Sequence, residues 1–126
     1  MRLSSSKPAI SSYDFMRLLC ATLASKKKMI IDLRSLVEKI YNFKISLGDD
    51  VKFLFEDIEF RDSVDCVVSY DISESINNLQ TFGVIGKLNP TYEKFIIYLT
   101  KTDSEAILSL YEDNIKQYIF ALAEAF

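Results

Sequence analysis

Apolar residues recur along most of this chain at steps of three and four, the spacing that lines one face of an α-helix. The first stripe predicts a helix from Ser12 to about Lys28. A second helix is predicted after Asp32, whose carboxylate can accept hydrogen bonds from the first free N–H groups. Its stripe consists of Leu33, Leu36, Val37, Ile40 and Tyr41. Residues 1–11 carry little apolar pattern and are predicted to form a loose arm.

The middle of the chain is less regular. Gly48-Asp49-Asp50 marks a break, after which the apolar spacing predicts a short third helix from Val51 to near Phe60, with a strand from Phe53 as the alternative. Residues 64–70 stay open between strand and helix, because their strand-like alternation is broken at Val67.

Residues 71–83 show a helix with signals at both ends. Asp71 and Glu74 have the spacing of a capping box, and apolar residues line one face from Ile72 to Phe82. Gly83 follows, where glycine can end a helix in the left-handed conformation. Two strands are then predicted, Val84 to Leu88 and Glu93 to Thr100, joined by a turn-forming segment with a proline. That segment is Asn89-Pro90-Thr91-Tyr92.

The last predicted helix occupies most of residues 101–126 and packs on the same domain. Thr102 and Glu105 have the spacing of a capping box, and a helix from there to Glu124 would be about 30 Å long. One apolar stripe would face the core, and several further apolar residues lie off it, which suggests a protein interface or a helix buried on most sides. The candidate interface residues are Leu108, Ile115, Ile119, Phe120 and Phe126.

The predicted order of successive helices followed directly by a hairpin, across residues 12–100, resembles the winged helix-turn-helix superfamily. The fold class expected is mostly α (α+β), a winged-helix-like domain with a two-stranded wing and a long C-terminal helix. Asn77 to Leu88 also resembles the helix-to-wing segment of small middle components in bacterial three-component systems that contain an ABC-type ATPase. That resemblance implies an accessory subunit, thought to act in defence against invading DNA. It transfers no functional residue, and the last helix lies outside the superfamily pattern.

Composition sets the scale of the protein. A chain of 126 residues with 49% hydrophobic residues fits one compact domain. The net charge of −3 gives no long-range attraction to phosphate backbones or anionic lipid. No apolar run approaches the roughly 20 residues that span a bilayer, so we expect a cytoplasmic protein without membrane contact. Cys20 and Cys66 are predicted to be reduced core thiols.

The residue inventory argues against an enzyme. The chain has no histidine, which removes Ser-His and Cys-His catalysis and every imidazole zinc site. Gly83 to Lys87 leads into a strand and not a helix, so it is no phosphate-binding loop. Carboxylates cluster between Glu56 and Asp65, but their spacing fits the solvated side of an amphipathic segment better than a metal site. No catalytic residue, cofactor, metal or small-molecule ligand is expected.

The charge distribution disfavours direct DNA binding. No lysine or arginine lies between Arg61 and Lys87, and this gap covers the helix that reads DNA in winged-helix proteins. We therefore expect a protein-interaction subunit that binds a partner or a second copy through the last helix, and next through the polar face of residues 72–82. The alternative is a dimeric winged-helix transcriptional regulator. Its candidate DNA contacts are Asn77, Asn78, Gln80, Lys87 and Lys94.

Overall fold

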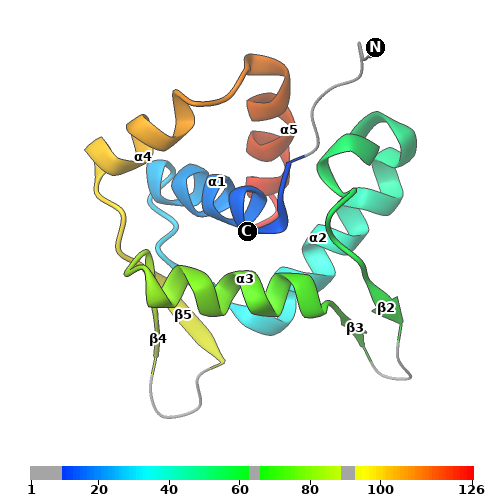
Figure 1. The fold of residues 1–126 in the computed structure, drawn as a ribbon, viewed down its shortest axis with the longest axis horizontal. Coiled ribbons are helices and arrows are strands. Elements are labelled where there is room, and N and C mark those ends of the chain that lie inside the picture. Colours follow the sequence, from blue (N-terminus) through cyan, green and yellow to red (C-terminus); the bar gives the residue numbers. More distant parts are fainter. Residues whose placement is uncertain (1–9, 63–65, 89–92) are drawn as a thin grey trace.

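The computed structural model describes residues 10–62, 66–88 and 93–126, which form an α+β fold (Figure 1). The helices are α1 (Ser12–Ser25), α2 (Leu33–Leu47), the 3-10 helix η1 (Gly48–Leu54), α3 (Tyr70–Thr81), α4 (Lys101–Leu108) and α5 (Asp113–Ala123). The strands are β1 (Ile30–Asp32), β2 (Arg61–Asp62), β3 (Val67–Val68), β4 (Ile85–Lys87) and β5 (Lys94–Ile97). Most of the predicted arm and the predicted turn at residues 89–92 lie outside the described residues. No described helix has the length and apolar character needed to cross a bilayer.

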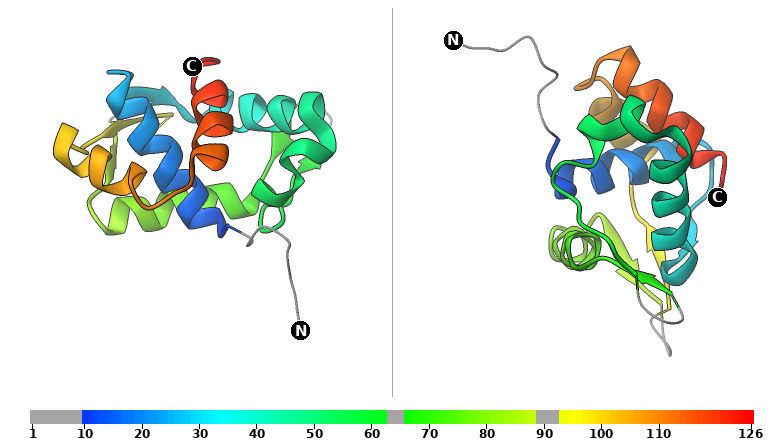
Figure 2. Two further views of the ribbon diagram at one scale, coloured as in Figure 1. Left: turned by 90° about the horizontal axis from the view of Figure 1, so that it is seen from above. Right: turned by 90° about the vertical axis from the view of Figure 1, so that its right-hand side faces the viewer.

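The hydrophobic core is built around α1. Its residues Leu18 to Leu23 are all buried, because other helices cover it on several sides. Figure 1 shows α1 between α3 below and α4 and α5 above, and the side view in Figure 2 has the same order. The buried hydroxyl of Thr22 donates to the carbonyl oxygen of Leu18 at 2.9 Å, which satisfies it inside the helix.

The larger sheet joins segments that are distant in sequence. Its strand order is β1-β5-β4, with both pairs antiparallel. Ile31 lies opposite Phe95, and Ile85 lies opposite Ile97; these four side chains are buried on the inner face of the sheet. The hairpin strands predicted around residues 84–100 are therefore present but shorter. β1 was not predicted, because three residues give no measurable alternation.

The structure decides the two predictions that were left open in the middle of the chain, helix or strand for residues 51–60 and for residues 64–70. The expected third helix is a 3-10 helix that ends at Leu54, six residues before Phe60. In the described part of residues 64–70, Val67 and Val68 form β3, which pairs with β2. The strand alternative holds for those two residues, and Tyr70 already belongs to α3.

The helix caps are partly as predicted. The Asp32 side chain accepts from the N–H groups of Arg34 and Ser35, as predicted for the start of α2. The cap of α3 is Ser69 instead of Asp71, and its hydroxyl accepts from the N–H of Ile72 at 3.3 Å. The Asp71 carboxylate instead accepts the N–H of Glu59 at 2.8 Å, so it ties α3 to the preceding loop.

The single long C-terminal helix was a wrong prediction. The segment forms two helices, α4 and α5, separated by residues 109–112. The capping box lies at Thr100 and Asp103, two residues before the predicted pair. Because the chain turns after Leu108, α4 packs on α1 while α5 packs on α1 and α2.

Candidate functional site

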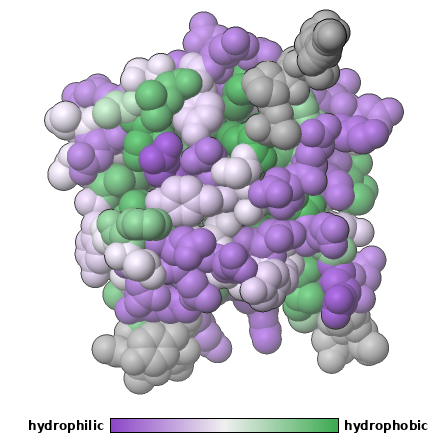
Figure 3. Space-filling model, viewed as in Figure 1, coloured by the Kyte–Doolittle hydropathy of each residue, from purple (hydrophilic) through white to green (hydrophobic). Residues whose placement is uncertain are grey.

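The outer face of α3 is the most distinctive polar surface of the fold. Its inner face is buried through Ile72, Ile76 and Leu79, so the opposite face is fixed toward solvent. In the space-filling view, hydrophilic colour dominates the band over α3 (Figure 3). The exposed residues there are Ser73, Glu74, Asn77, Asn78, Gln80 and Thr81. Ser75 on the same helix is buried.

An aromatic side chain stands at each end of this face. Tyr70 is 77% exposed at the first turn, and Phe82 is 72% exposed just after the last. The ring of Phe82 meets Tyr13 edge to face, with 6.0 Å between centroids. A hydrogen bond with Glu74, together with its negative charge, raises the pKa of the Tyr70 hydroxyl, which therefore remains a neutral donor at physiological pH. We call Tyr70, the exposed residues of α3 and Phe82 the α3 face.

The predicted DNA contacts are only partly brought together. The Lys87 ammonium donates to the Asn77 side-chain oxygen at 3.1 Å, so the wing lysine lies against the helix. Asn78 and Gln80 are exposed on the same helix. Lys94 lies at the start of β5, opposite Asp32 in the sheet register, so its charge faces an acidic neighbour.

A cleft of about 570 Å³ continues the α3 face at its N-terminal end. It is lined by Glu56, Asp57, Glu59, Phe60, Arg61, Val68, Tyr70 and Asp71. The Asp57 carboxylate accepts the N–H of Ser12 at 2.7 Å, which fixes the start of α1 beside the cleft. Within the described part of the chain, no group of acidic and cysteine side chains is arranged to hold a metal ion. Four acids against one arginine make the cleft an anionic surface that repels phosphate.

The predicted interface on the last helix needs a correction. Ile119 is fully buried in the core, because α5 turns this side toward α1 and α2, so it offers no contact surface. Leu108 and Ile115 are partly buried against the same core. Phe120 is 40% exposed, and the ammonium of Lys26 lies 5.8 Å from its ring centroid. Phe126 is partly buried, with the Lys39 ammonium 4.7 Å from its ring centroid.

Neither cysteine forms a disulfide within the part of the chain that the structure describes. Burial raises the pKa of the Cys20 thiol to about 12, so it stays protonated and behaves as a small apolar side chain. Cys66 is only partly buried.

Sequence reasoning missed the exposed aromatic ends of the α3 face. Tyr70 fell in a segment with no assigned structure, and Phe82 was counted in the buried stripe of the helix. The sequence did contain one indication. Phe82 is the last apolar residue of the stripe and lies next to Gly83, where the helix ends, so the helix no longer holds its side chain against the core. No family model, curated protein or solved structure matches this chain.

Proposed function

We propose that this chain is a non-enzymatic protein-interaction subunit on a winged-helix scaffold. The scaffold is supported by α3 leading directly into the β4–β5 hairpin, and by β1 joining that hairpin as a third strand. The main departure lies between α2 and α3, where the described residues include η1 and the β2–β3 pair. A helix-turn-helix has only three or four residues at this point, so the surface beside α3 differs from that of a simple DNA reader.

The observation that carries the proposal is the composition of the α3 face. Its exposed side chains are hydroxyls, amides and one carboxylate between Tyr70 and Phe82, and none of them is cationic. Tyrosine and phenylalanine are enriched at protein interfaces, and in antibody binding loops tyrosine supplies rigid contact area while serine and asparagine supply adaptable hydrogen bonds. A DNA-binding helix depends instead on lysine and arginine contacts to phosphate.

The C-terminal segment supplies a second, smaller contact region. Phe120 is the most exposed of the interface residues predicted there, and Leu110 in the α4–α5 connection is 66% exposed. An exposed apolar side chain adds contact area to a protein interface, whereas it cannot bind a phosphate group. The resemblance of residues 77–88 to the middle components of three-component systems supports an accessory role in a bacterial or phage defence complex.

A dimeric DNA-binding regulator is the second candidate function. The observation that favours it is the contact between Lys87 and Asn77, which places a cation and an amide together where α3 meets the hairpin. An asparagine at such a position can pair with adenine in the major groove, and the lysine can contact a neighbouring phosphate.

The experiment measures partner retention and DNA binding with the same variants. Tagged protein is purified from the cells that encode it, and co-purifying proteins are quantified for wild type, Tyr70→Asp and Phe82→Asp. Ile45→Asp is the matched control, because Ile45 is similarly exposed on α2, outside the α3 face. The purified protein is then mixed with duplex DNA at low salt, and its molar mass is measured by light scattering.

An interaction subunit retains a partner in wild type and Ile45→Asp, loses it in both aromatic variants, and gains no mass with DNA. A regulator gains mass with DNA in a salt-sensitive manner and loses that gain when Lys87 and Lys94 become glutamate. The second pattern would overturn the proposed function.

A further inference from the structure

A groove of about 550 Å³ lies along β1, just beyond the C-terminal end of α1. Its rim carries Lys27, Lys28 and Lys39, and its apolar lining includes Met29, Ile30 and Phe126. We call it the β1 groove. It shares no lining residue with the α3 face or the acidic cleft, so it is a separate surface of the molecule.

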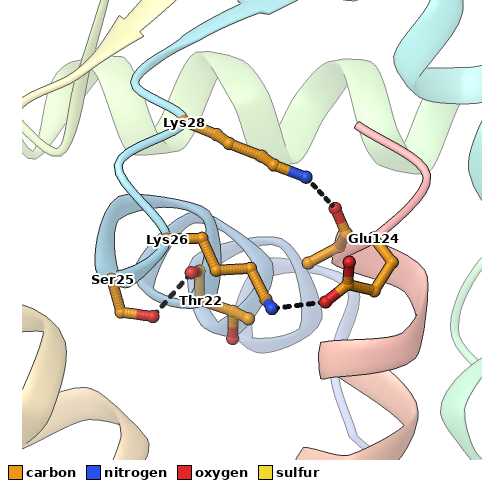
Figure 4. A network of polar contacts seen from close by, with 6 residues as sticks. Thr22, Ser25, Lys26, Lys28 and Glu124 are labelled. Carbon is orange, nitrogen blue, oxygen red and sulfur yellow. Dashed lines mark hydrogen bonds and ion pairs between the residues drawn. The ribbon is translucent and has the colours of Figure 1, made fainter.

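The charges around the β1 groove are predominantly positive. The Lys28 ammonium donates to the Ala123 carbonyl oxygen at 3.1 Å (Figure 4), and its charge also helps to lower the pKa of the Glu124 carboxyl, after the larger effect of Lys26. Lys26 beside it is paired with Glu124 at 2.6 Å. Asp32 is the one acidic side chain among the described lining residues, and its carboxylate already caps α2. An anionic segment is therefore attracted to the rim.

Lys27 keeps its cation on this rim at a conformational cost. It has a φ of +63°, the left-handed conformation that glycine adopts without strain. The equivalent position after α3 is Gly83, with a φ of +78°. Lysine is less favourable than glycine in this backbone conformation, and strained residues of this kind are typical of functional positions.

The outer edge of β1 offers main-chain hydrogen-bonding groups. The Met29 carbonyl accepts from the N–H of Ile97, and the N–H of Leu33 donates to the Glu93 carbonyl, both at 2.8 Å. In an antiparallel pair such positions alternate, so the N–H and C=O of Ile30 point away from β5. β1 ends the described sheet, and the Ile30 side chain is 58% exposed. An extended chain can pair with such an edge.

We propose that the β1 groove binds an extended acidic segment of a partner protein, which pairs with the edge of β1 at Ile30. The lysines attract its carboxylates, the main chain of Ile30 fixes its direction, and Ile30 with Phe126 contacts its apolar side chains. The apolar lining favours a polypeptide over a nucleic acid, whose backbone has no apolar side chains to fill it. The proposal does not depend on the α3 face.

The test uses a fluorescent peptide in which glutamate alternates with valine, titrated with the full chain at low salt and followed by anisotropy. We expect saturable binding that Ile30→Asp weakens by about tenfold and that Lys27→Glu with Lys39→Glu weakens by at least as much. The matched controls are Ile45→Asp and Lys52→Glu, since both side chains are exposed away from the groove, and they leave the affinity unchanged. Far-UV circular dichroism confirms that each variant is folded.

Three further probes separate the parts of the proposal. A peptide with lysine in place of glutamate should bind at least tenfold more weakly, and equal binding would overturn the charge argument. The acidic peptide N-methylated on alternate residues should lose binding, and retained affinity would overturn strand pairing. Oligothymidylate that binds as tightly as the peptide, with the same lysine dependence, would identify a phosphate site instead. No binding of the acidic peptide at millimolar concentration overturns the proposal altogether, whereas Tyr70→Asp should leave peptide binding intact.

Discussion

Replacing Lys27 by glycine should leave this protein more stable than replacing it by alanine. Lys27 follows α1 in a Schellman motif: its own N–H donates to the Ala24 carbonyl at 3.0 Å, and the N–H of Lys28 donates to the Leu23 carbonyl at 2.9 Å. The residue between those two bonds must adopt positive φ, and its value is +63°. A side chain with a Cβ atom is strained there.

The end of α3 has the same motif with the favoured residue in place. Gly83 donates to Gln80 at 3.1 Å, and Val84 donates to Leu79 at 2.9 Å. A Cβ atom added at Gly83 would meet nothing within 4 Å, so any cost of Gly83→Ala comes from the backbone alone. The chain therefore contains one motif twice, and the two positions can be exchanged as mutual controls.

The magnitude follows from two opposing terms. The left-handed conformation costs a residue with a Cβ atom about 1–2 kcal/mol. Glycine loses about 0.5–1 kcal/mol more conformational entropy than alanine on folding. We expect the difference, about 1 kcal/mol, between Lys27→Gly and Lys27→Ala, with the glycine variant more stable. Gly83→Ala should lose about the same amount, and each change should shift Tm by about 4 °C for a chain of this size.

The assay is urea unfolding followed by circular dichroism, with midpoints and slopes compared for the three variants and wild type. Lys27→Ala is needed as the reference, because Lys27→Gly also removes a positive charge near a helix C-terminus. That charge contributes about 0.3–1 kcal/mol, and both variants lose it. If the alanine and glycine variants at this position were equally stable while Gly83→Ala was destabilised, the strain assigned to Lys27 would be refuted.

Three further outcomes are expected. Ile119→Asp should lower the free energy of unfolding by more than about 4 kcal/mol or prevent folding, because it buries an unpaired charge. Phe120→Asp should change the free energy of unfolding by less than about 1 kcal/mol. Urea unfolding measures both. Thr100→Ala should cost about 1 kcal/mol by removing the cap of α4, whereas Thr102→Ala should be nearly neutral in thermal unfolding. The hydrogen bond and charge of Lys26 lower the pKa of the Glu124 carboxyl. The stability that this ion pair contributes is therefore fully present above the pKa that Glu124 has in the unfolded chain, and it is lost as the pH falls through the pKa in the folded chain. Glu124→Gln should therefore reduce the loss of unfolding free energy between about pH 6 and pH 3.

Much of the helical framework followed from apolar spacing, and its errors have physical causes. Asp71 was predicted as the cap of α3, but Ser69 is the cap, and the Asp71 carboxylate instead accepts the N–H of Glu59, twelve residues away in sequence. The apolar pattern runs on through residues 109–112 without glycine or proline, so the break between α4 and α5 comes from packing on α1 and α2. Local sequence carries neither contact.

The candidate surfaces were harder to predict than the framework. Ile119 and Phe120 are neighbours in sequence, yet one is fully buried and the other is 40% exposed, because the direction of α5 is set by the helices it packs on. The β1 groove could not be predicted at all, since β1 has three residues and its groove is completed by Lys39 and Phe126 from other parts of the chain. The absence of cations from the α3 face could be predicted, since it depends on composition and not on packing.

The described surface carries two regions of opposite charge, although the net charge of the chain is only −3. The acidic cleft lies beside Ser12 at the first residue of α1, and the β1 groove starts at Lys27, just beyond its last turn. α1 has 14 residues, so its ends are about 20 Å apart, which is twice the screening length at ordinary salt. Each surface therefore acts on an approaching partner nearly independently, and a segment attracted to one is repelled by the other. If both proposed contacts form, this domain would bind two partner segments of opposite charge, or orient one partner that carries both.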